Sequence, residues 1–315
     1  MGHSTLWDYR QRPIDVGRKI ATTWSGLTGF IYFGLDSFFG DIVKIIVVSD
    51  VHLGSEDSEK ESFNEFLGSL HDDDELTDLV LLGDIVEMWH RDASGAFLEN
   101  MDTVGLLKEL QKKIKVHWVA GNHDYHLLKL KNREPHYDYP FEFHETLELV
   151  DGKSTYRFMH GYEFEYGNET RLIRPILEIL CHVMSDSDGV PKDDMWTYLA
   201  RKMGDVQYSI ITERGEQGKL KITTGSIEDK PEIRLKNRIE GIEKLAYNEV
   251  REKPGHLLIF GHTHHAFICQ GENLVNTGSW CKEGTPHNTY VVLQHGKPHL
   301  FVYRGEEIMD RKIMS

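Results

Sequence analysis

The sequence predicts an α/β fold in which parallel β-strands alternate with helices. Short apolar runs rich in β-branched residues, typical of strands buried on both faces, are separated by stretches in which apolar residues recur at helical spacing. The order strand, helix, strand, helix, strand places successive strands side by side and parallel. With 315 residues, the chain is long enough for one large domain with an insertion, or for two modest domains.

The elements follow one another from residue 43 onward. The first strand is expected in "VKIIVVSD" (43–50), and a helix over 57–70 follows, with an apolar stripe of Phe63, Phe66, Leu67 and Leu70. The second strand is "DLVLLGD" (78–84). A second amphipathic helix, with a stripe of Phe97, Leu98, Met101, Val104 and Leu107, leads to the third strand in "KVHWVAGNHD" (115–124). Two later runs, "TYRFMHG" and "HLLIFGHTH", also read as strands.

Composition argues against several classes of protein. The chain has 36 Lys and Arg against 51 Asp and Glu, a net charge of −15, which disfavours binding to long nucleic acids or to an anionic membrane. Its three cysteines, Cys181, Cys269 and Cys281, show no CxxC spacing and predict neither a disulfide framework nor a zinc ribbon. We therefore expect a reducing, cytoplasmic location. The sequence leaves the oligomeric state open.

Residues 1–41 form an aromatic-rich segment that we separate from the domain over 42–315. The segment lacks a clear signal peptide, and its apolar part is too interrupted to span a bilayer. A helix through Trp24, Leu27, Ile31, Leu35 and Phe38 would carry an apolar face. Burial on the body of the protein is the default expectation. We also predict that residues 20–40 and 172–183 wall an apolar cleft, suited to a lipid-linked substrate or to peripheral membrane contact.

Candidate ligands follow the end of every expected strand. Because ligands of open α/β sheets gather beyond the carboxyl ends of the strands, side chains distant in sequence meet there. Any one Asp at such a position is more often a turn former or a helix cap, and the neighbouring glycines suit ordinary turns. That reading does not explain the histidines, which recur at strand end after strand end. The candidate set is Asp50, His52, Asp84, Asn122, His123, Asp124, His160, His262 and His264.

The residue types indicate the metal. Carboxylate, imidazole and amide ligands without thiolate suit Mn, Fe or Zn better than an all-oxygen calcium site. The spacing Asp50-x-His52 lets both side chains leave the same side of a strand end. Two cations about 3.5–4 Å apart that share a carboxylate clamp the oxygens of a reacting phosphate and lower the pKa of a bridging water. Seven ligands suffice for such a pair, and we expect Mn, with Fe, Zn or Co as alternatives.

Five short motifs, "DVHLG", "GDIVEMW", "GNHD", "MHG" and "GHTH", occur in this order. The ordered set resembles that of the calcineurin-like metallophosphoesterases, over roughly residues 43–165 and 255–303. The resemblance implies a fold of four layers, two mixed sheets flanked by helices. It also implies hydrolysis of a phosphodiester or pyrophosphate bond by a hydroxide that bridges the two metals.

The motifs also imply a role for each matched residue. The first metal would be held by Asp50, His52 and His264, the second by Asn122, His160 and His262, and Asp84 would bridge them. His123 would stabilise the phosphate or protonate the leaving oxygen, and Asp124 would orient it. Four histidines match no motif, and we expect surface or packing roles for them: His117, His126, His256 and His265.

Within the superfamily, "GDIVEMW" followed by "GNHD" is most similar to the UDP-2,3-diacylglucosamine hydrolase branch, which cleaves a pyrophosphate bond. Members of that branch often carry Arg where His123 stands, and "YEFEYGNET" after "MHG" differs from their pattern. A nuclease or a cyclic-nucleotide phosphodiesterase is the alternative activity. A non-catalytic interaction module with this fold is a further alternative, although such a module would be expected to lose ligands.

The segment between His160 and His262 reads as a helical insertion over about 166–254. Its first helix would carry an apolar stripe from Leu172 to Val183. A later helix, beginning near Ser226, would carry a stripe of Leu235, Ile239, Ile242, Leu245 and Ala246. Such stripes are usually core, and the alternative is a cap over the substrate. Three arginines, Arg171, Arg174 and Arg201, could bind phosphate, but surface charge is the default role.

Overall fold

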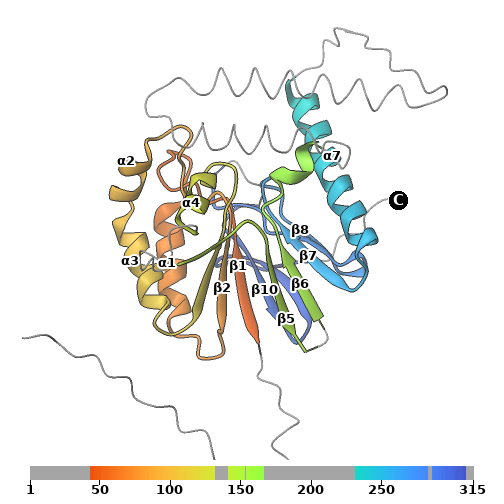
Figure 1. Ribbon diagram of the computed structural model, residues 1–315, viewed down its shortest axis with the longest axis horizontal. Coiled ribbons are helices and arrows are strands. Elements are labelled where there is room, and N and C mark those ends of the chain that lie inside the picture. Colours follow the sequence, from red (N-terminus) through yellow and green to blue (C-terminus); the bar gives the residue numbers. More distant parts are fainter. Residues whose placement is uncertain (1–42, 132–140, 153, 167–230, 283–285, 310–315) are drawn as a thin grey trace, which may run out of the picture. The chain divides into compact units, whose positions relative to one another are not determined.

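Two mixed β-sheets pack face to face with helices on both outer faces (Figure 1). The computed structural model that defines them describes residues 43–131, 141–152, 154–166, 231–282 and 286–309. These residues belong to the unit Gly40–Ser315. The predicted four-layer α/β sandwich is confirmed.

The first sheet has seven strands in the order β12-β11-β10-β1-β2-β3-β4. Strands β1 to β4 run parallel and the rest antiparallel, so the predicted βαβαβ arrangement of the first three is confirmed. The bounds are β1 Lys44–Val48, β2 Asp78–Leu82, β3 Lys115–Val119, β4 Glu142–His144, β10 Thr289–Gln294, β11 Lys297–Val302 and β12 Glu307–Ile308.

The second sheet has five strands in the order β5-β6-β7-β9-β8. Its centre, β6, β7 and β9, is parallel, and both edge pairs are antiparallel. The bounds are β5 Leu147–Asp151, β6 Ser154–Phe158, β7 His256–Phe260, β8 Phe267–Cys269 and β9 Leu274–Asn276. The two later runs that the sequence analysis read as strands are thus β6 and β7.

Apolar clusters between successive layers hold the sandwich together. Alternate residues of β1 to β3 face the second sheet, where they meet Tyr156, Phe158 and Ile259. The opposite residues pack against α1 (Lys60–Leu70), α2 (Ala93–Leu98) and α3 (Met101–Leu110). The second sheet is covered by α7 (Pro231–Glu252). The remaining elements are short: η2 Tyr125–Leu127, α4 Leu128–Lys131, η3 Tyr162–Tyr166 and η4 Gln270–Glu272.

The second predicted helix is two helices, which corrects the expected stripe. Leu98 and Met101 flank the break and are 73% and 57% exposed. Asn100 causes the break: its side-chain amide donates to the Ala96 carbonyl at the end of α2, and it stands as the N-cap of α3. The buried positions of the pair are therefore Ala96, Asn100, Thr103, Leu107 and Leu110.

Helix α7 shows that at least part of the predicted insertion is core. Ile242, Ala246 and Val250 are buried and pack against Leu258 and Phe260 of the second sheet, as the default reading of its stripe predicted. Several other predictions fall on residues outside the described ranges. These are the N-terminal segment 1–41, the stripe at 172–183, the three arginines, and a helix start near Ser226.

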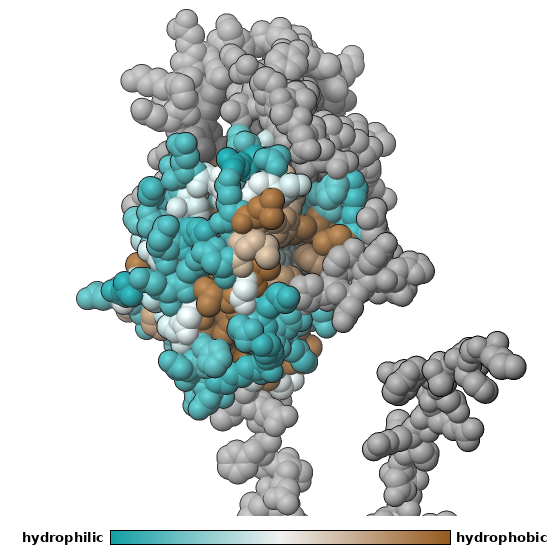
Figure 2. All heavy atoms as spheres, turned by 90° about the vertical axis from the view of Figure 1, so that its left-hand side faces the viewer, coloured by the Kyte–Doolittle hydropathy of each residue, from teal (hydrophilic) through white to brown (hydrophobic). Residues whose placement is uncertain are grey.

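The face formed by the first helical layer is mainly hydrophilic but carries apolar side chains near its middle (Figure 2). The exposed Leu98 and Met101 belong to this helical layer. Among the described residues, no helix is both long and apolar enough to cross a membrane.

Candidate metal centre

The loops that follow β1, β2 and β7 hold five candidate ligands in an unusual backbone conformation. A positive φ is uncommon for residues with a side chain and costs on the order of 1–3 kcal/mol each. Such strain persists only where the surrounding structure enforces it, and it concentrates at functional sites. The five, with φ between 49° and 67°, are Asp50, His52, Asp84, His262 and His264.

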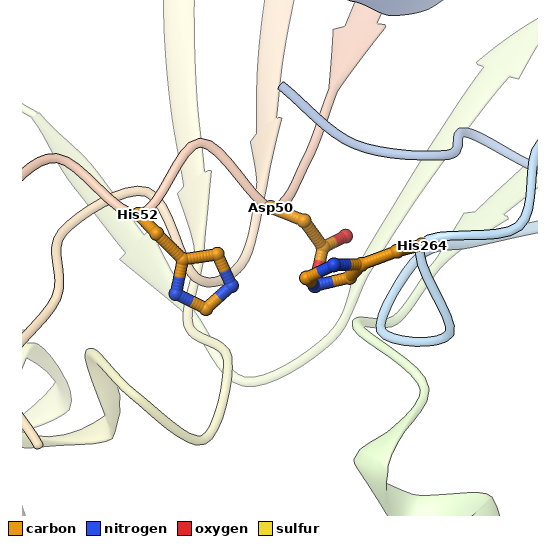
Figure 3. A group of neighbouring side chains, drawn as sticks. All are labelled: Asp50, His52 and His264. Carbon is orange, nitrogen blue, oxygen red and sulfur yellow. The ribbon is translucent and has the colours of Figure 1, made fainter. Parts of the chain in front are cut away.

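Asp50, His52 and His264 form the first group of converging side chains (Figure 3). Asp50 and His52 follow β1, while His264 comes from the loop after β7. Nε2 of His264 lies 3.3 Å from Oδ1 of Asp50. The other carboxylate oxygen of Asp50 accepts the backbone N–H of His262 at 3.0 Å and the hydroxyl of Ser49, which fixes the carboxylate in place.

Asp84, His160 and His262 form the second group. Nε2 of His160 lies 3.1 Å from Oδ2 of Asp84, and Nε2 of His52 lies 3.8 Å from the same oxygen. This oxygen therefore stands between the two groups, where a bridging ligand would have to be. Nδ1 of His160 donates to the Leu82 carbonyl at 2.9 Å, which leaves Nε2 as the nitrogen that could bind a metal.

Four buried atoms in this cluster have no hydrogen-bond partner. Buried polar atoms are nearly always paired, because an unpaired one costs about 1–3 kcal/mol. Here the unpaired atoms belong to four predicted ligands and are the ones that a cation would contact. They are Oδ1 of Asp50, Nε2 of His52, Oδ1 of Asn122 and Nε2 of His160. The residues thus fit a pair of divalent cations.

The charges of the cluster favour a cation as well. Burial would raise the pKa of Asp84, but the neighbouring His160 and His123 hold it below its usual value. Burial would likewise lower the pKa of His160, yet Asp84 and Asp50 raise it to about 10. The cause of the upward shift is the attraction of two buried carboxylates for positive charge.

Glycines leave room for the ligands. A Cβ on Gly83 would lie within 3.0 Å of the His160 ring, and one on Gly121 would lie equally close to the Asp84 carboxylate. A Cβ on Gly261 would meet Asp50 in the same way. From sequence alone, these glycines were also compatible with ordinary turns. In the structure, a side chain at any of the three positions would clash with a candidate ligand.

A comparison with protein families identifies the chain. Residues 43–266 match the family described as calcineurin-like phosphoesterase. The chain belongs to this family. No curated protein matches it.

Similar solved structures share little sequence with this calcineurin-like phosphoesterase. A dimetal phosphatase from Danio rerio is 14% identical with a TM-score of 0.42, covering 84% of this chain and 100% of that one. The Pseudomonas putida nuclease MPE is 14% identical with a TM-score of 0.32, covering 84% and 87%. Vacuolar Protein Sorting 29 from Cryptosporidium parvum is 14% identical with a TM-score of 0.37, covering 85% and 99%.

Glu87 is a buried residue of the candidate centre that the sequence analysis did not single out. It is 2% exposed. Its Oε2 accepts from Nδ1 of His52 at 3.0 Å and from Nδ1 of His123 at 2.8 Å. Its Oε1 accepts the backbone N–H of Trp89 at 2.7 Å and that of His90 at 3.0 Å. A signal was available, because this acidic residue lies inside the motif "GDIVEMW", three positions after Asp84.

Asp124 does not orient His123, which corrects the expected contact. Oδ1 of Asp124 accepts from the Gly121 backbone at 2.7 Å, and Oδ2 accepts from the Ile85 backbone at 2.9 Å and the Trp118 indole at 3.1 Å. Among the described residues, none of its bonds comes from His123. Its carboxylate instead joins the loop after β2 to the loop after β3, each of which carries a candidate ligand.

His123 is positioned beside the two groups of ligands. Its ring stacks on Trp89, with centroids 4.2 Å apart, and meets the His52 ring edge-on at 4.7 Å. Its backbone N–H donates to Oδ1 of Asp84 at 2.8 Å. Burial would lower the pKa of His123, but Glu87 and Asp84 raise it above its ordinary value. A protonated imidazole is thereby favoured next to the cluster.

Proposed function

We propose that the protein hydrolyses a phosphodiester or pyrophosphate bond at a dinuclear metal centre. The observation that carries the proposal is the convergence of two groups of ligand side chains, in which buried atoms of Asp50, His52 and His160 have no hydrogen-bond partner. Family membership agrees with it. A pair of divalent cations would neutralise phosphate charge and lower the pKa of a water.

The ligand assignment is part of the proposal. Asp50, His52 and His264 would hold one cation, and Asn122, His160 and His262 the other, with Asp84 between them. The mixture of carboxylate, imidazole and amide donors supports Mn, with Fe, Zn or Co as alternatives.

The chain's own groups would act around that centre. His123 would donate a hydrogen bond or a proton to the substrate, because Glu87 holds its Nδ1 and leaves Nε2 as the other donor. The same carboxylate would fix the tautomer of His52 that presents Nε2 to a cation. Asp124 would act indirectly, by keeping the loops of Asp84 and Asn122 together.

The substrate is the finer part of the proposal. The motifs "GDIVEMW" and "GNHD" support the pyrophosphate of a UDP-sugar-lipid-like molecule, by their similarity to the UDP-2,3-diacylglucosamine hydrolase branch. The net charge of −15 disfavours a long nucleic acid.

A substrate panel tests both levels. Chelator-stripped protein reloaded with Mn²⁺ would be assayed on UDP-linked sugars and lipids, bis(p-nitrophenyl) phosphate, cyclic nucleotides and single-stranded DNA. We expect metal-stimulated turnover of a diester and preference for the UDP-linked pyrophosphate. Absence of bound metal together with no Mn- or Co-stimulated turnover would refute the proposal.

A truncation tests the lipid contribution separately. Deleting residues 1–40 should spare the small chromogenic diester but impair a lipid-linked pyrophosphate, because only the latter uses binding energy remote from the reacting phosphate. Equal loss on both substrates would mean that the segment serves the structure alone.

A further inference from the structure

A second cluster of metal-ligating side chains lies at the edge of the first sheet, away from the candidate centre. His117 on β3 and Glu142 on β4 are direct partners in the parallel register, and His144 follows two residues along β4. Alternate residues of a strand share a face, so all three side chains lie on one face of the sheet. One ligand atom from each lies within 4.8 Å of the other two.

The cluster contains two unpaired buried nitrogens. Nδ1 of His117 and Nε2 of His144 have no hydrogen-bond partner. The His117 side chain is 6% exposed. The nitrogens lie 3.7 Å and 3.8 Å from the same carboxylate oxygen, Oε2 of Glu142. These distances are too long for hydrogen bonds. They approach the roughly 3.3 Å that separates two ligands of a tetrahedral zinc ion with bonds of about 2.0–2.1 Å.

The buried carboxylate of Asp78 orients the His117 ring for binding a metal through Nδ1. Nε2 of His117 lies 2.8 Å from Oδ1 of Asp78. Burial would raise the pKa of Asp78, but hydrogen bonds from His117 and Thr77 hold it below its usual value. An ionised Asp78 therefore keeps the His117 proton on Nε2 and leaves the Nδ1 lone pair directed at the cluster. A carboxylate behind a ligating histidine is the usual arrangement at zinc sites.

The third ligand and the second imidazole agree with this chemistry. Burial lowers the pKa of His144 despite the nearby Glu142, which favours the neutral ring that a metal requires. The Glu142 side chain is 73% exposed, so a cation bound here would keep a coordination position open to solvent. Two imidazoles and a carboxylate form a ligand set that zinc uses with an open fourth position.

We propose that His117, Glu142 and His144 form a third metal site, which binds a single divalent cation of the zinc class. The sequence analysis expected only a surface or packing role for His117. The site is separate from the strand-end centre, because Asp78 begins β2 whereas Asp84 follows its end, about 20 Å apart at roughly 3.3 Å per residue. A cation here would fasten the three-residue edge strand β4 to β3.

Zinc stoichiometry tests the proposal without reference to catalysis. Chelator-stripped full-length protein would be dialysed against micromolar free Zn²⁺ and its metal counted by elemental analysis. We expect His144→Gln and His117→Gln to bind one ion fewer than the unsubstituted protein and to retain its Mn-dependent diesterase rate. His299→Gln, which removes a half-exposed histidine on β11, is the matched control and should keep the full count. An undiminished count in both cluster variants would overturn the proposal.

Glu142→Gln separates loss of the metal site from loss of the fold, because the largely exposed Glu142 side chain can be replaced without disturbing the core. We expect at least tenfold weaker binding of one Zn²⁺ ion and an unchanged circular dichroism spectrum. Zn²⁺ should also raise the Tm of the unsubstituted protein by an increment that this variant loses, since a ligand of the native state stabilises it. Unchanged Zn²⁺ affinity in Glu142→Gln would refute the role of the carboxylate and with it the site.

Discussion

Replacing Glu87 with Gln should weaken both the first metal site and the action of His123. One carboxylate oxygen accepts from Nδ1 of His52 and of His123, and the other accepts two backbone N–H groups, those of Trp89 and His90. A glutamine of the same shape has a single acceptor oxygen. Either His52 or the two backbone groups would therefore face an NH₂ group that cannot accept. Nδ1 of His123, which lies 2.8 Å from one oxygen and 2.9 Å from the other, would have a neutral amide in place of a carboxylate.

The expected losses of metal affinity and of kcat/KM in Glu87→Gln follow from these contacts. Loss of a group that orients a metal ligand typically costs 10–100-fold in metal affinity or activity. Loss of a well-oriented acid costs about 10²–10⁴-fold. Saturating Mn²⁺ should largely compensate for the weaker metal affinity, which leaves the loss of acid catalysis. We therefore expect kcat/KM to fall by about 10²-fold, which corresponds to roughly 2.7 kcal/mol. That value lies within the roughly 1.5–3 kcal/mol of a hydrogen bond to a charged group. The Mn²⁺ concentration for half-maximal activity should rise at least about tenfold.

The assay is hydrolysis of bis(p-nitrophenyl) phosphate over a range of Mn²⁺ concentrations and pH values, with thermal melting as a check of folding. Glu148→Gln on β5, which removes a 55% exposed carboxylate, is the control and should behave like the unsubstituted protein. The reasoning would be refuted if Glu87→Gln stayed within threefold of the unsubstituted protein in both quantities and kept its pH profile.

Three further experiments test other parts of the molecule. Asp84→Ala should abolish diesterase activity more completely than His123→Ala, because the first removes the proposed ligand of both cations and the second should cost about 10²–10⁴-fold; full activity of His123→Ala would contradict its proposed role. Gly121→Ala should reduce metal content and activity, since its Cβ would displace the Asp84 carboxylate, whereas Gly105→Ala on α3 meets open space and should change neither. Ile242→Ala should lower the free energy of unfolding by about 2–5 kcal/mol in urea denaturation, and an unchanged midpoint would contradict the packing of α7 against the second sheet.

The location of the candidate centre could be predicted because strand ends are visible in sequence. A buried strand is recognisable in the sequence as an apolar run, and parallel strands bring the residues that follow them to one edge of the sheet. Asp50, Asp84 and His160 therefore meet in the structure as expected, and the two groups of converging side chains agree with the division that the motifs implied. The assignment of each residue to a metal stays a prediction.

The partners of the imidazoles could not be predicted in the same way. Asp124 is next to His123 in sequence, yet its carboxylate faces the loop after β2. Glu87 reaches His123 because the turn after β2 folds the N–H groups of Trp89 and His90 back onto its carboxylate. Such contacts depend on the path of a loop, and periodicity carries no information about that path.

The break between α2 and α3 illustrates the same limit. Apolar spacing alone favours one continuous helix through Leu98 and Met101. The side-chain amide of Asn100 bonds the Ala96 carbonyl instead, and this local bond competes with the helical one. The apolar stripe is consequently shared between two shorter helices, and the two residues at the break are exposed.

The candidate centre combines features that oppose folding when taken alone. Left-handed backbone at five candidate ligands, unpaired buried atoms and adjacent buried carboxylates all raise the free energy of the native loops. The strands that lead into these loops, β1, β2, β3 and β7, are buried almost completely on both faces, and this core holds the loops in place. The five ligands with left-handed backbone belong to the two groups of side chains that converge at this point of the molecule. Because cations bound at that point would pair the unpaired atoms and offset the charge of the carboxylates, metal affinity and the order of these loops should be strongly coupled.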